Sequence, residues 1–301
     1  MINHLQLQKE HEVLQSHLVQ EAYRKTVQTW GEPPCSFSFF FVGSTGREEQ
    51  HYRSDQDHGL IFEDPGENNQ NYFLCLGKEI NLALSKGGYS NCEGNVMASL
   101  EGWNRSFMDW SNLINICRER KTFDDLRTFL MLFDAKLQLG DGKLIQAIKQ
   151  KQIKLAKDTD FVWWLAENTR KVPVSLNAFG KIVGETVDLK EAVYYPIIHT
   201  IRLFAIMEGI LESNSLERLK KIHTLSQDEK NRMELLLKTY FSLRLNWTSE
   251  KQDYKNIHQL DVSLLSEEDK KELKRLIKES HSFHNKWTRR IQKWAKNREI
   301  G

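Results

Sequence analysis

The sequence of 301 residues lacks the features that mark secreted, zinc-binding or membrane-spanning proteins. Its four cysteines form no CxxC pair and no Cys/His cluster with zinc-ligand spacing, and they do not indicate a secreted disulfide framework. No apolar run approaches the roughly 20 residues of a membrane-spanning helix. The first residues lack the basic and then apolar pattern of a signal peptide. We therefore expect a reduced, cytoplasmic protein without a membrane partner.

The sequence also has almost no excess of charge of one sign. It contains 43 basic and 41 acidic residues, and its formal net charge is +2. This balance provides no electrostatic surface for binding phosphates of nucleic acid, so nucleic acid is not an expected partner. Hydrophobic residues make up 40% and charged residues 28% of the chain, a composition typical of an ordinary globular protein with a core.

Apolar residues in the first half of the chain alternate between helical and strand-like patterns. Helical spacing extends from His4 to Trp30, and SFSFFFVGS and HGLIF read as two short strands. The apolar run over residues 128–141 is predicted as a third strand. Further helices are predicted at NYFLCLGKEINLALSKGG and SFMDWSNLINICRER.

After residue 142 nearly all patterns are those of long helices. We therefore predict an α+β fold in two domains. Residues 1–142 are expected to form a small mixed β-sheet with flanking helices, including the N-terminal one. Residues 143–301 are expected to form an all-α helical bundle.

One polar stretch between the first two predicted strands has a pattern with chemical meaning. Gly43 and Ser44 end the first strand, and Asp55 and Asp57 begin the second. Side chains two residues apart on a strand share a face, so the two carboxylates converge and repel each other unless a cation lies between them. Oxygen ligands favour a hard ion such as Mg²⁺. A glycine lets backbone N–H groups approach a phosphate, and Arg47 is placed to bind a polyphosphate.

A third acidic residue, Asp134, interrupts the apolar run LMLFDAKL. A carboxylate in such a run is costly to bury without a cationic partner. Asp134 either completes a two-metal site with Asp55 and Asp57, or it caps a strand or pairs with a structural arginine. For the stretch as a whole, the alternative is an ordinary polar turn, and for Arg47 it is a surface salt bridge.

The ordered set of motifs resembles the signature of the DNA polymerase beta-like nucleotidyltransferase superfamily. GSTGREEQ at residues 43–50, followed by SDQD at residues 54–57, is most similar to the branch that contains the uridylyltransferase of the nitrogen-regulatory PII protein. Relatives in that branch are often fused to CBS or cyclic-nucleotide-binding domains, and no such module is expected here. Further matches cover most of the chain: CEGNVMA at 92–98 with Trp103 and Trp110, FDAKLQLGD at 133–141, NAFGKI at 177–182, VDLK at 187–190, Arg202, and LERL at 216–219.

The resemblance implies an enzyme that moves a nucleoside monophosphate from an NTP to a hydroxyl group and releases pyrophosphate. The acceptor would be a protein or a small molecule. Two Mg²⁺ ions, with Mn²⁺ as an alternative, would be held by Asp55, Asp57 and Asp134. The triphosphate would be bound by Gly43, Ser44 and Arg47.

The resemblance also implies that the helical part is a substrate-binding or nucleotide-binding domain. Lys190 and Arg202 would either contact nucleotide phosphates or brace Asp188 and Glu191. No His-Asp motif of a metal-dependent phosphohydrolase is present, so the uridylyl-removing activity of the PII enzyme has no counterpart. The alternative function is a non-catalytic nucleotide-binding regulator on the same fold. Modification of nucleic-acid ends is a third reading, and the near-zero net charge counts against it.

Overall fold

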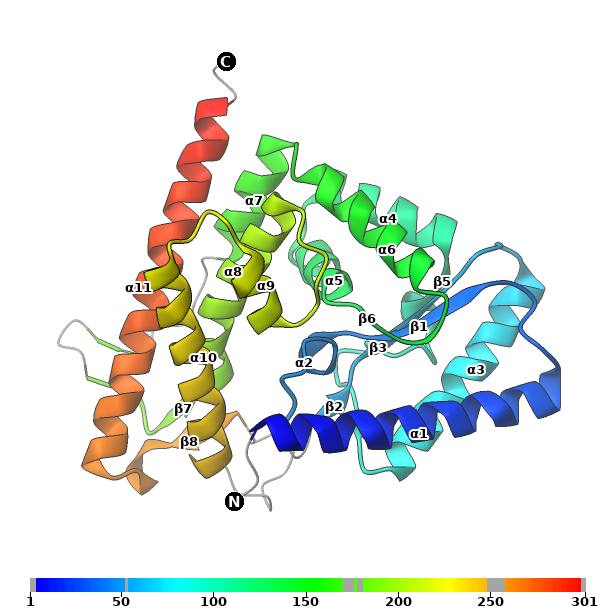
Figure 1. The fold of residues 1–301 in the computed structure, drawn as a ribbon, viewed down its shortest axis with the longest axis horizontal. Helices are drawn as coiled ribbons and strands as arrows, with labels where there is room; N and C mark the ends of the chain where they lie inside the picture. The colour runs from blue at the N-terminus through cyan, green and yellow to red at the C-terminus, as the bar shows by residue number, and fades with distance from the viewer. Residues whose placement is uncertain (1–3, 52–53, 170–175, 178–180, 248–257, 299–301) are drawn as a thin grey trace. The chain divides into compact units, whose positions relative to one another are not determined.

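The computed structural model of the chain describes residues 4–51, 54–169, 176–177, 181–247 and 258–298. The chain divides into two compact units (Figure 1). The first comprises Met1–Ile153 and a later segment, Leu211–Asn214, and the second comprises Lys154–Ile210 and Ser215–Gly301. The boundary expected at residue 142 lies at the start of helix α6, Gly142–Leu155, whereas the units divide near the end of that helix.

A mixed four-stranded sheet forms the centre of the first unit, in the order β5-β3-β1-β6. Strand β1, Phe37–Phe41, pairs antiparallel with β3, His58–Phe62, and with β6, Lys136–Gly140. Strand β5, Asn104–Ser106, runs parallel to β3. Every residue of β1 and β3 is buried, as expected of continuous apolar runs covered on both faces. The two strands predicted from SFSFFFVGS and HGLIF are thus confirmed.

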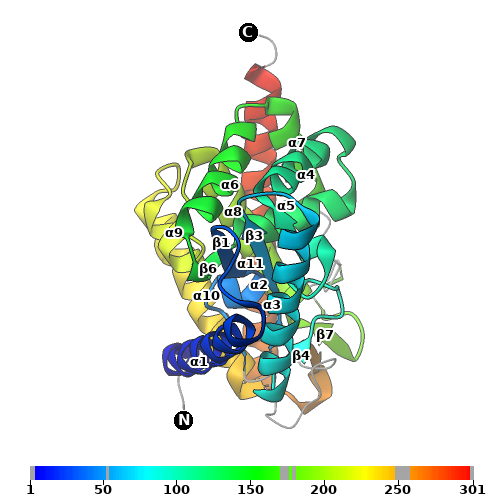
Figure 2. The same ribbon diagram turned by 90° about the vertical axis from the view of Figure 1, so that its right-hand side faces the viewer.

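Helices cover both faces of this sheet. Helices α1, His4–Trp30, and α3, Glu67–Lys86, pack together on one face (Figures 1 and 2). On the other face, Phe40 of β1 contacts Trp110 of α4, Phe107–Arg120, with ring centroids 6.3 Å apart. The core between the sheet and helices α1 and α3 includes Val19, Ala22, Phe37, Phe39, Phe41, Leu60, Phe62, Phe73, Leu76, Ile80 and Leu84.

The third strand predicted over residues 128–141 is wrong in its first half. Helix α5 extends over Phe123–Phe133, and only Lys136–Gly140 forms a strand. A capping box begins the helix: Thr122 Oγ1 accepts a hydrogen bond from the Asp125 backbone N–H (3.2 Å), and Asp125 Oδ2 accepts one from the Thr122 backbone N–H (3.1 Å). The first part of the apolar run, residues 128–133, therefore forms the second half of this capped helix.

Short elements complete the first unit. They are the helical turn α2, Gly43–Gly46, the parallel pair β2, Asp55–Gln56, and β4, Ser90–Asn91, and the 3₁₀-helix Glu101–Trp103.

In its described residues, the second unit consists mainly of helices, with one short antiparallel pair of strands and an isolated β-bridge between Leu176 and Ile182. The long helix α11, Glu267–Arg298 (orange to red in Figure 1), packs against α7, Thr159–Thr169, and α8, Tyr195–Glu208. The remaining elements are a π-helix at Lys190–Tyr194, α9 at Ser215–Lys221, α10 at Gln227–Trp247, β7 at Thr186–Asp188, β8 at Gln259–Asp261 and a 3₁₀-helix at Val262–Leu264.

The predicted fold class, a small mixed sheet with flanking helices followed by a helical domain, is confirmed. The β7–β8 pair was not predicted from the sequence. Within the described ranges, no helix combines the length and the apolar character needed to cross a membrane.

Candidate functional site

Three side chains converge in the first unit at the place where the sequence predicted a metal site. Asp55 lies in β2, Asp57 precedes β3, and Cys92 follows β4. One donor atom from each residue lies within 4.8 Å of the other two. Asp55 and Asp57 are partly exposed and Cys92 is buried. In the part of the chain that the structure describes, no other group of at least three Asp, Glu, His or Cys side chains converges in this way.

The β2–β4 pair explains why Cys92 comes close to the two aspartates. Asp55 pairs with Ser90 and Gln56 with Asn91, so the residue after β4 lies beside Asp57. Gln56 is fully buried, and its Nε2 donates hydrogen bonds to Asn91 Oδ1 (3.0 Å) and to Ser85 Oγ (3.0 Å). Because extended residues alternate between two sides, anchoring Gln56 inside the protein directs Asp55 and Asp57 to the opposite side.

His58 is a second buried anchor for this segment. Its Nδ1 accepts a hydrogen bond from the Ala98 backbone N–H (2.9 Å), so the proton lies on Nε2, which donates to Gln56 Oε1 (2.9 Å). Complete burial lowers the pKa of His58 from 6.5 to about 3. The imidazole is therefore neutral at pH 7 and is not exposed to act as a metal ligand.

This burial predicts a loss of stability in acid. Below pH 6.5 the unfolded chain protonates His58 and the folded chain does not until about pH 3, so the unfolded state binds more protons and is stabilised relative to the folded state as the pH falls. We expect the residue to cost about 2 kcal/mol of unfolding free energy between pH 7 and pH 5. Urea unfolding at both pH values measures the loss.

Burial also lowers the pKa of His11 and His281, so the informative quantity is the difference between the wild-type protein and His58→Asn. The variant is expected to lose about 2 kcal/mol less on acidification. An equal loss in both proteins would contradict this role of His58.

The turn α2 packs directly on Asp57. The Val42 backbone N–H donates to the Asp57 carbonyl (2.9 Å), which extends the β1–β3 pairing to the start of the turn. Gly43 has φ +61°, and a Cβ at this position would overlap Asp57 Oδ2. Only glycine fits both conditions without strain. The glycine predicted to approach a phosphate thus borders one of the two converging carboxylates.

Gly43→Ala is expected to destabilise the protein by about 1–2 kcal/mol through backbone strain. If Asp57 binds Mg²⁺, as the motifs lead us to expect, the variant should also bind the ion about tenfold or more weakly, because the new methyl group displaces the Asp57 carboxylate. Urea unfolding and calorimetric Mg²⁺ titration measure the two effects.

Two other glycines separate these contributions. Gly88 has φ +93° and Gly102 has no positive φ, and a Cβ added to either residue would have no neighbouring atom within 4 Å. Gly88→Ala should therefore lower stability alone, and Gly102→Ala should change neither quantity. Unchanged Mg²⁺ affinity in Gly43→Ala would contradict the expectation that the Asp57 carboxylate beside this glycine binds the metal.

Arg47 and Asp134 form a buried ion pair. Arg47 Nη1 binds the Asp134 carboxylate, and Arg47 Nε lies 2.7 Å from Glu49 Oε2. The exposed fractions are 2% for Arg47, 0% for Asp134 and 4% for Glu49. Of the alternatives that the sequence offered for Asp134, the structure contains the pairing with an arginine. For Arg47, a surface salt bridge is wrong because the pair is buried.

Asp134 lies at the C-terminal end of α5, where its backbone N–H donates to the Met131 carbonyl (3.0 Å). A Cβ on Gly46 would overlap the Asp134 carbonyl oxygen, so this glycine allows α2 to pack against the end of α5. Asp134 does not belong to the group formed by Asp55, Asp57 and Cys92 in the described structure. Its role as a metal ligand, and that of Arg47 as a triphosphate ligand, stay predictions.

Cys92 is the member of the group that sequence reasoning missed as a site residue. Burial raises the pKa of the Cys92 thiol, and the adjacent Asp57 carboxylate, which accepts its hydrogen bond, raises the pKa further. The thiol therefore keeps its proton and donates to Asp57. Zinc-type spacing could not reveal this cysteine, and the one signal was its place in the CEGNVMA motif.

Lys190 and Arg202, predicted to bind nucleotide, both belong to the second unit. Lys190 begins the π-helix, with its Nζ 5.3 Å from the ring centroid of Tyr195. Arg202 lies in α8 and is buried. Asp188, the last residue of β7, accepts a hydrogen bond from the Glu191 backbone N–H (2.9 Å) near the start of the π-helix. Part of the matching NAFGKI segment, residues 178–180, lies outside the described residues.

Comparison with known families gives two matches. Residues 2–123 match the family model described as "Putative nucleotidyltransferase DUF294". Residues 159–291 match DUF294_C, described as "Putative nucleotidyltransferase substrate binding domain". No curated protein matches the chain. The two matches occur in the order expected from the motifs, one over the unit with the converging carboxylates and one over the helical unit. The chain therefore belongs to the DUF294 nucleotidyltransferase family and carries its C-terminal substrate-binding domain.

Proposed function

We propose that the protein is a Mg²⁺-dependent nucleotidyltransferase that moves a nucleoside monophosphate from an NTP to an acceptor hydroxyl and releases pyrophosphate. One observation carries the proposal. Asp55 and Asp57 converge beside the Gly43 turn in a chain whose family models name a nucleotidyltransferase and its substrate-binding domain.

The donor atoms at this place fit a hard divalent cation. Asp55 and Asp57 offer carboxylate oxygens that lie within 4.8 Å of each other and are accessible from solvent, which suits Mg²⁺ and Mn²⁺. When bound, the ion would neutralise charge on the triphosphate and on the departing pyrophosphate. Cys92 would not be a ligand for Mg²⁺, and its hydrogen bond would orient Asp57. A second ion would need another carboxylate, and the one assigned from the motifs, Asp134, is bound to Arg47.

The remaining assigned residues would bind and orient the nucleotide. Gly43 and Ser44 would let the triphosphate approach the backbone of α2 beside Asp57. Arg47 would support this turn from its buried side, because Glu49 and Asp134 occupy its Nε and Nη1. In the helical domain, Lys190 and Arg202 would contact the nucleotide. The family resemblance to PII uridylyltransferases favours a regulatory protein as acceptor, with a small molecule as the alternative.

Incubation of the protein with each α-labelled NTP, Mg²⁺ and a cell lysate tests the proposal. We expect label to move to one acceptor species with one preferred NTP, together with pyrophosphate release, and we expect EDTA to abolish both. Absence of transfer and of pyrophosphate release with all four NTPs, in Mg²⁺ and in Mn²⁺, would overturn the proposal.

One observation favours a second candidate, a non-catalytic nucleotide-binding regulator. The third acidic residue of the motif set is engaged in a buried ion pair, which leaves two carboxylates in the converging group. Saturable binding of one of these NTPs to the purified protein, with neither label transfer nor pyrophosphate release in the incubation described above, would identify this function.

A further inference from the structure

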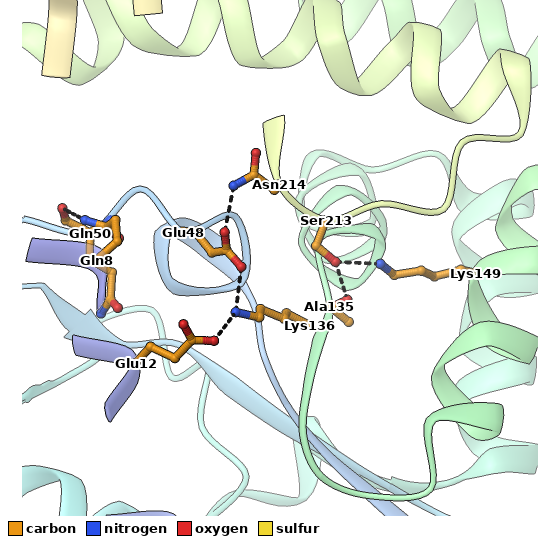
Figure 3. Close-up of polar contacts among 9 residues, drawn as sticks. All are labelled: Gln8, Glu12, Glu48, Gln50, Ala135, Lys136, Lys149, Ser213 and Asn214. Atoms are coloured by element: carbon orange, nitrogen blue, oxygen red, sulfur yellow. Dashed lines mark hydrogen bonds and ion pairs between the residues drawn. The ribbon is translucent and has the colours of Figure 1, made fainter. Parts of the chain in front are cut away.

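A segment from late in the sequence completes the first unit next to α2. Leu211–Asn214 connects α8 to α9 along the chain, yet it belongs to the first unit. Ser213 Oγ donates a hydrogen bond to the Ala135 carbonyl (2.6 Å), and Asn214 Nδ2 donates one to Glu48 Oε2 (2.9 Å) (Figure 3). Two consecutive residues of this segment thus bind the residues that follow Asp134 and Arg47, the two members of the buried ion pair.

A buried lysine, Lys149, also binds the segment Leu211–Asn214 through hydrogen bonds. Lys149 of α6 has 3% of its surface exposed, and its Nζ donates a hydrogen bond to the Leu211 carbonyl (2.9 Å). It donates another to Ser213 Oγ (2.8 Å) (Figure 3). The Ser213 hydroxyl therefore accepts one hydrogen bond and donates another. Hydrogen bonds to a charged, buried donor are the strong ones, so Ser213 is held in a defined place.

Glu48 is the residue that this segment reaches, and its backbone is strained. It has φ +61°, a left-handed conformation that is unfavourable for a residue other than glycine. Its carboxylate contacts Asn214 and also Lys136 Nζ (2.6 Å), which in turn contacts Glu12 (3.0 Å) (Figure 3). These contacts compensate the strain and fix the direction of the side chain.

The end of the same loop is held by helix α1. Gln8 donates from its Nε2 to the Gln50 carbonyl (2.8 Å) and accepts at its Oε1 from the Gln50 backbone N–H (2.9 Å) (Figure 3). The loop after α2 is thus bound by side chains of α1, by Lys136 of β6 and by Asn214.

The loop after α2 contains two consecutive acidic residues, Glu48 and Glu49, next to the proposed triphosphate site. In GREEQ, two consecutive acidic residues follow the turn assigned to a triphosphate, and carboxylates that turned toward the anion would repel it. Arg47 binds Glu49. Lys136 and Asn214 bind Glu48. Each carboxylate therefore has a donor that holds it in one direction.

We propose that Asn214, supported by Ser213, is a positioning residue for the loop after α2. It holds the Glu48 carboxylate and with it the backbone of residues 47–50, so that the turn at Gly43 keeps its shape beside Asp57 and can receive a triphosphate. The part of this inference that concerns the triphosphate rests on the proposed function, whereas the positioning of the loop does not.

Asn214→Asp tests the inference because it replaces the donor by a carboxylate facing Glu48. We expect amide hydrogen exchange over residues 43–51 of the full-length protein, without ligand, to become about tenfold faster. Adding Glu48→Gln to this variant restores a hydrogen bond with donor and acceptor exchanged, and we expect exchange to return to within about twofold of the wild-type rate. A merely structural loss at Asn214 would not be rescued by a second substitution.

Asn231→Asp is the matched control, because Asn231 lies on α10 and bonds to Gln227 of the same helix. It should leave exchange over residues 43–51 unchanged. Should Asn214→Asp not fold, Asn214→Ala removes the donor without adding charge and is expected to give about threefold faster exchange. Unchanged exchange in a folded Asn214 variant, or absence of rescue by Glu48→Gln, would overturn the inference.

A calorimetric titration of the same proteins with inorganic triphosphate and Mg²⁺ separates this inference from the proposed function. We expect about tenfold weaker binding in Asn214→Asp and recovery in the double variant. If the wild-type protein binds neither triphosphate nor any NTP while exchange responds as expected, the proposed function fails and the positioning stands. If triphosphate binds but exchange does not respond, the positioning fails and the proposed function stands.

Discussion

Asp57→Asn is expected to lower nucleotidyl transfer by about a thousandfold or more. The substitution keeps the shape of the side chain and removes the charge that, together with Asp55, would hold the divalent ion. Metal stabilisation of transition-state charge is worth several kcal/mol, and each 1.36 kcal/mol corresponds to about a tenfold change in rate. Initial rates of pyrophosphate release with the preferred NTP, at saturating Mg²⁺, measure the effect.

Asp64→Asn is the matched control, because Asp64 is an exposed aspartate of the same unit outside the converging group. It should retain the wild-type rate. Asp57→Asn should also keep its cooperative urea unfolding, because Asp57 is partly exposed and its carbonyl, not its carboxylate, pairs with the end of β1 at Val42. A folded Asp57→Asn protein with a rate within tenfold of wild type would remove Asp57 from the metal site.

Asp134→Ala is expected to cost about 3–5 kcal/mol of unfolding free energy, the largest stability effect predicted for the chain. The substitution leaves the Arg47 guanidinium buried without its Asp134 partner, and an uncompensated buried charge is strongly destabilising. Equilibrium urea unfolding measures the loss. Replacing the whole buried cluster, as in Asp134→Ala with Arg47→Met and Glu49→Gln, should recover part of it, because neither the guanidinium nor the Glu49 carboxylate that it binds is then left as a buried charge.

An exposed ion pair provides the comparison for this experiment. Lys25 and Glu79 lie 2.5 Å apart with 60% and 32% of their side chains exposed, so Glu79→Ala should cost at most about 1 kcal/mol. A similarly small loss in Asp134→Ala would contradict the buried pair as a main support of α2. Mg²⁺ titration of the Asp134 variant then tests separately whether this carboxylate also binds metal.

The first unit could be predicted from the sequence wherever a pattern was local. The β1 and β3 strands are apolar runs bounded by polar segments, and the spacing of Asp55 and Asp57 alone indicates that both side chains share a side. The convergence of these two carboxylates was therefore predictable. The α5 helix was not, because TFLMLF is too short to distinguish a buried strand from a helix by periodicity. The decisive signal was the capping box at Thr122 and Asp125, six residues before the expected strand.

Other parts of the site depend on contacts between residues far apart in the sequence. Cys92 reaches Asp57 because β2 and β4 pair in parallel, and neither strand, at two residues each, leaves a pattern that can be recognised. Asn214 reaches Glu48 through a connection between two helices, where loop composition carries no information about a partner 166 positions away. Arg47 and Asp134 were each singled out by the sequence, but their mutual pairing follows only from the packing of α2 on α5.

The return of Leu211–Asn214 to the first unit limits how evolution or an engineer can divide this gene. A shortened protein ending at the first family match, or anywhere before residue 211, would lose the contacts that this segment makes, and one that kept α6 would leave the ammonium group of Lys149 in the interior without two of its acceptors. Grafting a foreign helical domain after α6 would have the same result unless the graft supplied an equivalent of these four residues. The first unit therefore depends on four residues that lie, in the sequence, within the match to the substrate-binding domain. We expect recombination between relatives to retain the two regions together.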